Sequence, residues 1–147
     1  MNYLLDTNIL LTYIRSKEQR EIIESQYKIF SLNTPIISVV TVGEIESIGL
    51  RNHWGDRRFD ILDKLLDRII ITDINSEDVI QKYAEIDTYS QNKLIGSPLK
   101  NTSRNMGKND LWIAATASVI NATLITTDQD FSHLSDRYFP LKLIKIP

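Results

Sequence analysis

Tyr3-Leu4-Leu5-Asp6 stands near the start of the chain as a short apolar run that ends at a carboxylate, and the same pattern recurs further along. Short runs rich in β-branched residues predict further buried strands, at residues 36–40, 69–72, 122–126 and 141–146. The segments between them predict helices, at residues 9–14, 18–30, 41–50, 59–66, 76–86 and 107–121. Strands that alternate with helices favour βαβ units, so we expect an α/β fold with a mainly parallel central sheet and helices on both faces.

Length and composition fit one folded domain over residues 1–147. Of the 147 residues, 42% are hydrophobic and 24% are charged, which argues against wholesale disorder. No stretch approaches the ~20 apolar residues of a membrane span. The N-terminus carries no basic leader, so we expect a cytoplasmic protein with no membrane segment.

The inventory of reactive residues restricts the chemistry. The absence of cysteine excludes disulfides, a thiolate nucleophile and cysteine-ligated metal sites. The two histidines, His53 and His133, cannot form a three-histidine zinc site, and both are expected at the surface. The net charge is −2, so binding of a nucleic acid has to depend on local basic patches.

Several acids are expected at one end of the sheet, because the carboxyl ends of parallel strands meet at the same edge. They follow a predicted strand or open the helix before one: Asp6, Glu44, Asp110, Asp128 and Asp130. Like charges at ~4 Å repel by about 4 kcal/mol per pair at an effective dielectric of ~20. Protonation or a hard cation has to relieve that repulsion, and oxygen ligands without Cys or His suit Mg²⁺ or Mn²⁺.

Each of these acids also has a purely local explanation. Glu44 has capping-box spacing from Thr41. Asp6 and Asp110 suit the first turn of a helix, and the two acids that follow the fourth strand suit a turn. The hypothesis of a shared site therefore depends on the sheet bringing the acids together.

Four segments resemble, in the same order, the sequence blocks of a PIN domain, and together they extend over nearly the whole chain. They are Leu4-Leu5-Asp6-Thr7-Asn8-Ile9-Leu10, Ser38-Val39-Val40-Thr41-Val42-Gly43-Glu44-Ile45, Asn109-Asp110-Leu111-Trp112-Ile113-Ala114-Ala115-Thr116-Ala117 and Leu124-Ile125-Thr126-Thr127-Asp128-Gln129-Asp130-Phe131. The small single-domain form looks most like a VapC-type toxin, the ribonuclease of a toxin–antitoxin pair.

The resemblance implies a three-layer α/β/α sandwich and a Mg²⁺- or Mn²⁺-dependent endoribonuclease. The catalytic acids and metal ligands that it implies are Asp6, Glu44, Asp110 and Asp128, with Asp130 as an outer metal ligand. Asn8 and Thr127 match polar positions that support such acids by hydrogen bonding. The resemblance also implies an RNA substrate, a cognate antitoxin and a homodimer.

An acidic pocket repels RNA, so we expect cations beside it. Between residues 88 and 109 there is no acid, and the candidates are Lys93, Lys100, Arg104 and Lys108. A second surface is expected to bind an antitoxin helix in an apolar groove, with candidate lining residues Ile48, Leu50, Trp54, Phe59 and Leu62.

Three other functions remain open at this point. A non-catalytic PIN-like module would bind RNA or protein without a metal. A haloacid-dehalogenase-type phosphatase needs a second aspartate two positions after Asp6, where this chain has Asn8. A receiver-type signalling domain usually carries an acidic pair at the end of its first strand.

Overall fold

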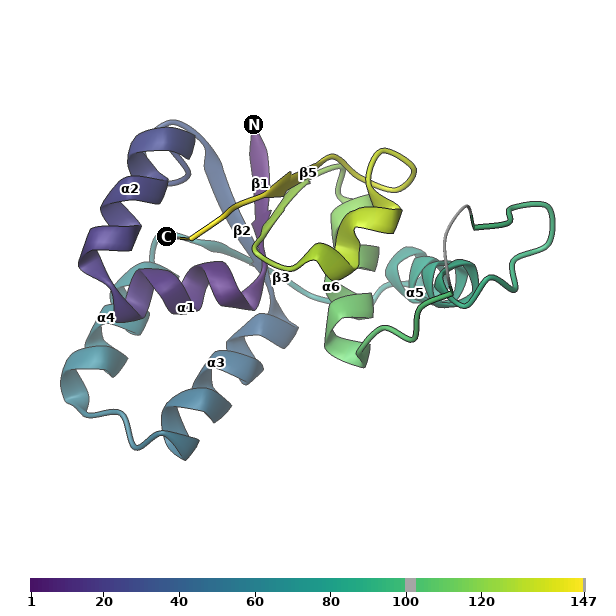
Figure 1. Cartoon of the computed structure of the whole chain (residues 1–147). Coiled ribbons are helices and arrows are strands. Elements are labelled where there is room, and N and C mark those ends of the chain that lie inside the picture. Colours follow the sequence, from purple (N-terminus) through teal and green to yellow (C-terminus); the bar gives the residue numbers. More distant parts are fainter. Residues whose placement is uncertain (100–102, 147) are drawn as a thin grey trace.

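The computed structural model describes residues 1–99 and 103–146. One sheet of parallel strands runs through the molecule, in the order β3-β2-β1-β4-β5 (Figure 1). The strands are β1 (Asn2–Leu5), β2 (Thr34–Ser38), β3 (Ile70–Thr72), β4 (Thr123–Thr126) and β5 (Leu141–Leu143). The helices are α1 (Thr7–Arg15), α2 (Lys17–Tyr27), α3 (Val39–Arg51), α4 (Asp56–Leu66), α5 (Glu77–Ser90), α6 (Lys108–Val119) and the 3-10 helix η1 (Gln129–Leu134).

Successive side chains of each inner strand point to opposite faces of the sheet, which creates one apolar core on each side. Tyr3 and Leu5 of β1 pack with residues of α1, α2, α3 and α4. Leu4, which lies between them in the sequence, packs with α5, α6 and η1 on the other face. The strands β2 and β4 divide their side chains in the same way. The helices thus form two layers around the sheet (Figure 1), and the predicted α/β/α architecture is confirmed.

The second strand ends earlier than predicted, and this decides where α3 begins. Val39 and Val40, predicted as strand residues, form the first turn of α3. Ser38 is the N-cap of that helix, and its hydroxyl accepts the backbone N–H of Val40 at 3.1 Å. This cap outweighs the β preference of the two valines. The capping-box explanation for Glu44 is therefore wrong, because Glu44 lies in the second turn of α3.

Helix α2 also ends before its predicted limit at residue 30. Its C-cap, Lys28, adopts a left-handed backbone with φ 52°. The carboxylate of Glu24 accepts the backbone N–H groups of Phe30 and Ser31 at 3.0–3.1 Å, and the hydroxyl of Tyr13 at 3.0 Å. Burial alone would raise the pKa of Glu24, but these hydrogen bonds outweigh burial and lower it. One carboxylate thus ties the α2–β2 loop to α1.

The region after β4 is more ordered than the predicted turn. It contains η1, whose Phe131 and Leu134 are fully buried on the α5–α6 side of the sheet. This packing fixes the segment that leaves the C-terminal end of β4. Across residues 1–99 and 103–146, no helix has the length and apolar character needed to cross a membrane.

Candidate functional site

Asp6 lies where the central strand β1 passes into α1. It is the N-cap of α1, and its Oδ1 accepts the backbone N–H of Thr7 at 2.8 Å. Its Oδ2 accepts the hydroxyl of Thr126 at 2.6 Å, and the side chain is almost fully buried. Burial raises the pKa of Asp6, the two hydrogen bonds oppose the rise, and the charges of Glu44 and Asp128 add to it, so that the net pKa is raised.

Asp110 stands opposite, in the first turn of α6. Burial raises its pKa to about 7, and the negative charges of four neighbours contribute in the order Asp6, Asp128, Glu44 and Asp130. Electrostatic effects of this kind require proximity. The structure therefore brings together, at one end of the sheet, the five acids that the sequence analysis expected there.

Buried hydroxyl groups hold Glu44 beside the β1–α1 junction. The Thr7 hydroxyl donates to Glu44 Oε1 at 2.9 Å and lies 3.3 Å from the hydroxyl of Thr41. Both threonines are buried. Because the Thr7 N–H binds Asp6 while its hydroxyl binds Glu44, one residue fixes two carboxylates from different elements.

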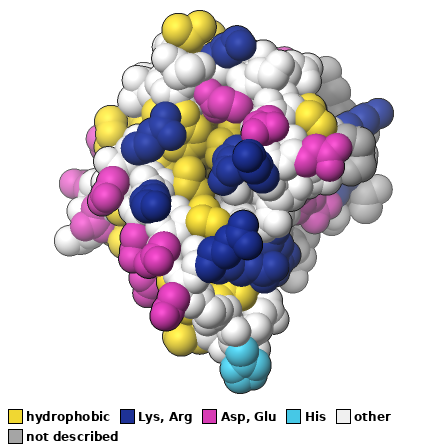
Figure 2. Space-filling view, turned by 90° about the vertical axis from the view of Figure 1, so that its left-hand side faces the viewer, with side chains coloured by type: hydrophobic (Ala, Val, Ile, Leu, Met, Phe, Trp, Pro, Cys, Tyr) yellow, Lys and Arg dark blue, Asp and Glu magenta, His cyan; other side chains and the backbone are white. Residues whose placement is uncertain are grey.

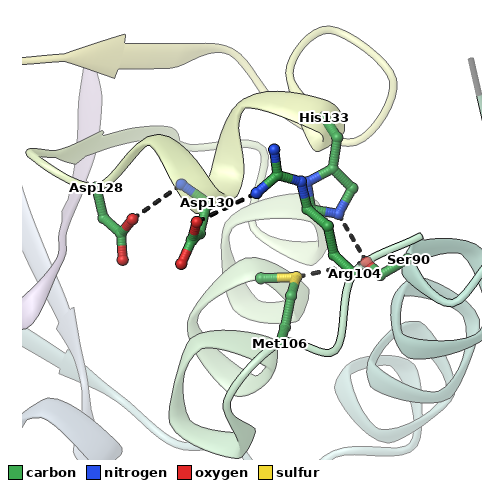
Figure 3. Close-up of polar contacts among 6 residues, drawn as sticks. All are labelled: Ser90, Arg104, Met106, Asp128, Asp130 and His133. Carbon is green, nitrogen blue, oxygen red and sulfur yellow. Dashed lines mark hydrogen bonds and ion pairs between the residues drawn. The ribbon is translucent and has the colours of Figure 1, made fainter. Parts of the chain in front are cut away.

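A chain of hydrogen bonds continues from Asp6 toward the α5–α6 connection. Thr126 Oγ1 accepts the N–H of Asp128 at 3.0 Å, and Asp128 Oδ1 accepts the N–H of Asp130 at 2.8 Å. Asp130 Oδ1 then lies 3.2 Å from Arg104 Nη1 (Figure 3). Asp6, Asp128 and Asp130 thus share a continuous polar network that ends at Arg104.

Three open hollows surround the start of α6, and they adjoin because they share lining residues. One of about 470 Å³ is lined by Glu44, Asp110 and the first residues of α6. A second of about 460 Å³ extends from Glu44 along α3. A third of about 220 Å³ lies between Asp110, Asp130 and Arg104. The resulting cleft gives solvent access to Glu44, Asp110 and Asp130.

The donor set of this cleft suits a hard divalent cation by its chemistry, because it consists of carboxylates that repel one another. Within residues 1–99 and 103–146, no three Asp, Glu or His side chains lie close enough together to hold a metal ion as they stand. A cation would have to draw the carboxylates together.

The supporting polar residues differ from those that the resemblance implied. Asn8 is exposed, and in the described part of the chain neither its side chain nor that of Thr127 forms a hydrogen bond. The bond expected from Thr127 comes from its neighbour Thr126. The β1–β4 register pairs Leu5 with Ile125, which sets Thr126 beside Asp6. That signal becomes visible only once the strand order is known.

The structure places two of the predicted cations, Arg104 and Lys108, at the cleft. Arg104 pairs with Asp130, and Lys108 is the first residue of α6 and lines the hollow of about 470 Å³. Lys93 is exposed just after α5. Lys100 lies outside the described residues.

Two surface predictions are wrong. His133 is half-buried rather than exposed, and its Nε2 lies 2.8 Å from the hydroxyl of Ser90 on α5. Burial lowers the pKa of His133, and the nearby charge of Arg104 lowers it further. Trp54 and Leu62, predicted to line an antitoxin groove, are buried in the core instead.

Comparisons with known proteins agree with this geometry. The chain is 27% identical over 141 residues to Ribonuclease VapC1 of Haemophilus influenzae (strain R2866), across 92% of this chain and 94% of that protein. It resembles the structure of VapBC2 from Rickettsia felis bound to a DNA fragment from their promoter, with a TM-score of 0.76 and 28% identity over 97% of this chain and 98% of that one. VapBC-1 from nontypeable Haemophilus influenzae gives a TM-score of 0.70 at 25% identity, with the same coverage. The family model of the PIN domain matches residues 3–137, and the protein therefore belongs to the PIN domain family.

Proposed function

We propose that this protein is a divalent-metal-dependent endoribonuclease, the toxin of a toxin–antitoxin pair, which cuts RNA phosphodiester bonds in the cytoplasm. The observation that carries this proposal is the convergence of acids on an open cleft, where the pKa of Asp110 rises to about 7. The PIN family membership and the similarity to proteins named Ribonuclease VapC1 support the same activity.

Asp6 and Asp110 are the direct metal ligands in this proposal, with Glu44 and Asp128 around them. Each oxygen of Asp6 accepts one hydrogen bond and keeps capacity for a further contact. A bound Mg²⁺ or Mn²⁺ would supply the positive charge that activates water and stabilises the negative charge developing on the phosphate. Without the cation, the negative charges of Asp6 and Asp110 would face the negatively charged phosphate with nothing to balance them.

The remaining side chains orient the reacting groups. Thr7 and Thr126 each bind one oxygen of Asp6, which fixes the orientation of this carboxylate. Glu44 uses Oε1 to accept the Thr7 hydroxyl, and its Oε2 accepts the proton of the attacking water in our proposal. A positioned base of this kind typically contributes ~10²–10⁴-fold to a rate.

Cations at the rim offset the repulsion between this cleft and RNA. Lys108 lines the cleft, while Lys93 and Arg104 border the segment between α5 and α6. We propose that these residues, together with Lys100, contact the RNA backbone. Each lost phosphate contact should lower the salt dependence of binding to single-stranded RNA by ~0.7 in a log–log plot.

We place the antitoxin on the face formed by α2 and α4, away from the acids. There an apolar floor of Ile61 and Leu65 is bordered by Arg20, Lys64 and Arg68. Figure 2 shows apolar side chains in a hollow between groups of Lys and Arg side chains on this side of the molecule. Among the described residues, none of these three cations forms an ion pair. This combination fits an amphipathic segment with acidic side chains.

A charge-reversal experiment tests this assignment. The double substitution Lys64→Glu and Arg68→Glu should weaken the complex with the antitoxin encoded beside the gene by at least tenfold in calorimetry. Arg104→Ala, at the cleft, should leave that complex unchanged. Equal affinities for all three proteins would remove the groove from the proposal.

Light scattering of the free chain tests the expected homodimer.

Cleavage of a labelled single-stranded RNA by the purified chain tests the main proposal. Activity should require Mn²⁺ or Mg²⁺, stop with EDTA, and fall at least 10³-fold in Asp6→Asn and Asp110→Asn. The matched control is Asp63→Asn on the exposed part of α4, which should cut at the wild-type rate. Full activity of Asp6→Asn would falsify the mechanism.

The alternatives give different results in the same assays. A non-catalytic RNA- or protein-binding module shows no Mn²⁺ affinity in calorimetry and no cleavage. A phosphatase hydrolyses a generic aryl phosphate and leaves RNA intact.

A further inference from the structure

Arg104 and Asp130 meet at the edge of the acidic cleft in a contact that can be exchanged. Arg104 Nη1 lies 3.2 Å from Asp130 Oδ1, and the two side chains are 43% and 64% exposed. Among the described residues, this is the only acceptor of the guanidinium group. Exposed single-contact pairs of this kind are weak. The guanidinium can therefore pass to a different oxygen acceptor at little cost.

The backbone of Arg104, in contrast, is held in place. Its N–H donates to the carbonyl of Ser90 at 2.6 Å. The Ser90 hydroxyl is fully buried and contacts Met106 Sδ at 3.4 Å and His133 Nε2 at 2.8 Å (Figure 3). The backbone bond of Arg104 and the contact of Met106, two residues later, thus fix where the Arg104 side chain starts, while its charged end stays free to move.

The space in front of this guanidinium is open and lacks a side-chain cap. The hollow of about 220 Å³ is lined by Arg104, Asn105, Met106, Gly107, Asp110 and Asp130. One water occupies ~30 Å³ in the liquid, so this hollow has room for several waters. That space is also enough for a phosphate group. Gly107 is the N-cap of α6 and provides no side-chain hydrogen bond to the first backbone N–H groups of that helix. These backbone N–H groups favour an anion at this place, in addition to the positive charge of Arg104.

We propose that Arg104 binds the RNA phosphate next to the one that is cleaved, and that Asp130 pairs with the Arg104 guanidinium while no RNA is bound. This inference rests on the proposed ribonuclease function and assigns a phosphate subsite to the hollow beside Asp110. A phosphate oxygen replaces Asp130 Oδ1, and no covalent bond changes. Arg104 is then a substrate-binding residue and Asp130 a positioning residue. The fifth acid of the cluster therefore has a different task from that of an outer metal ligand.

Opposite effects of the two partners test this exchange. The probe is a short fluorescein-labelled single-stranded RNA, titrated in EDTA so that binding is measured without cleavage. Arg104→Ala should weaken binding about fivefold and lower the salt slope by ~0.7. Asp130→Asn should tighten binding about threefold, because the guanidinium loses its competitor and the RNA loses one repelling charge. Lys17→Ala, at the exposed start of α2, serves as the charge-matched control and should bind like the wild type.

A double-mutant cycle separates exchange from simple repulsion. In the Arg104→Ala background, Asp130→Asn should give a clearly smaller gain, because only the repulsion is removed. Equal gains in both backgrounds, or weaker RNA binding by Asp130→Asn, would overturn the proposal. The same holds if Asp130→Asn lowers Mn²⁺ affinity as much as Asp110→Asn does. If the wild type cleaves RNA and these variants bind RNA as tightly as the wild type does, only the phosphate subsite is refuted. If the wild type neither binds nor cleaves RNA, the proposed function is refuted.

Discussion

Replacing Asp110 by asparagine should make the metal-free protein more stable, although it should abolish cleavage. In the folded protein burial and neighbouring charges raise the pKa of Asp110 from 3.8 to about 7. The folded state therefore binds this proton more tightly than the unfolded state does. The stability that the proton provides is complete below pH 3.8 and is lost as the pH rises through about 7. Asparagine keeps the size of the side chain without the charge.

The size of the gain follows from these two pKa values. At ~1.36 kcal/mol per pH unit, the difference between 3.8 and about 7 corresponds to an upper limit of about 4 kcal/mol. Asp110 is only partly buried, and solvent screening reduces this figure to about 1–2 kcal/mol. In a protein of this size the midpoint temperature of unfolding should rise by about 3–6 °C at pH 8. Near pH 4 the two proteins should unfold alike.

Thermal unfolding followed by circular dichroism in EDTA measures this difference at both pH values. Asp63→Asn on α4 is the control, and its stability should stay within about 0.5 kcal/mol of the wild type at either pH. Adding Mn²⁺ at pH 8 should stabilise the wild type more than Asp110→Asn. An Asp110→Asn protein that is less stable than the wild type at pH 8, or equally shifted at both pH values, would refute the electrostatic reasoning.

Substitutions at Glu24, Thr126 and Gly49 test single hydrogen bonds and packing contacts. Glu24→Gln should cost about 1 kcal/mol at pH 7, because it weakens hydrogen bonds to backbone N–H groups. The lowered pKa of Glu24 means that this cost shrinks as the pH falls below 4.5, so an equal cost in denaturant unfolding at pH 7 and pH 3 contradicts it. Thr126→Val should reduce stability by about 1–2 kcal/mol and cleavage at least tenfold, while Thr126→Ser keeps the hydroxyl and should restore both; matching losses in the two variants speak against this bond. Gly49→Ala would place a Cβ 2.8 Å from aromatic ring atoms and should cost about 1–3 kcal/mol in urea unfolding. Gly43→Ala on the same helix meets no atom within 4 Å and should gain about 0.5–1 kcal/mol, so shifts of equal sign would contradict the packing argument.

The layered fold was predictable because apolar runs and amphipathic segments alternate along this chain. The ends of the helices and strands were harder to predict, because they depend on single hydrogen bonds. Val39 and Val40 have the character of strand residues, yet one Ser38 hydroxyl bond turns them into the first turn of a helix. Likewise Glu24 captures the N–H groups after Tyr27, so the helix ends there.

The shared location of the acids at one edge of the sheet was predictable for a geometric reason. A residue directly after a parallel strand lies at the same edge of the sheet as the residues that follow the other strands. The position of Asp6 can therefore be predicted from the end of β1 alone. The support given by Thr126 was not predictable, since it depends on the strand order that sets β4 beside β1. The contact between Ser90 and His133 joins residues 43 positions apart and has no local signal.

The contact between Arg104 and Ser90 has a consequence for how this enzyme scaffold can diversify. The chain leaves α5 at Ser90, and the Arg104 N–H contacts the carbonyl of Ser90, so the detour between these two residues starts and ends at one point. Lengthening such a detour is cheap, at about 0.6 kcal/mol for each doubling. Insertions, deletions or grafts there can change which nucleotides the protein reaches while the acids below remain where they are.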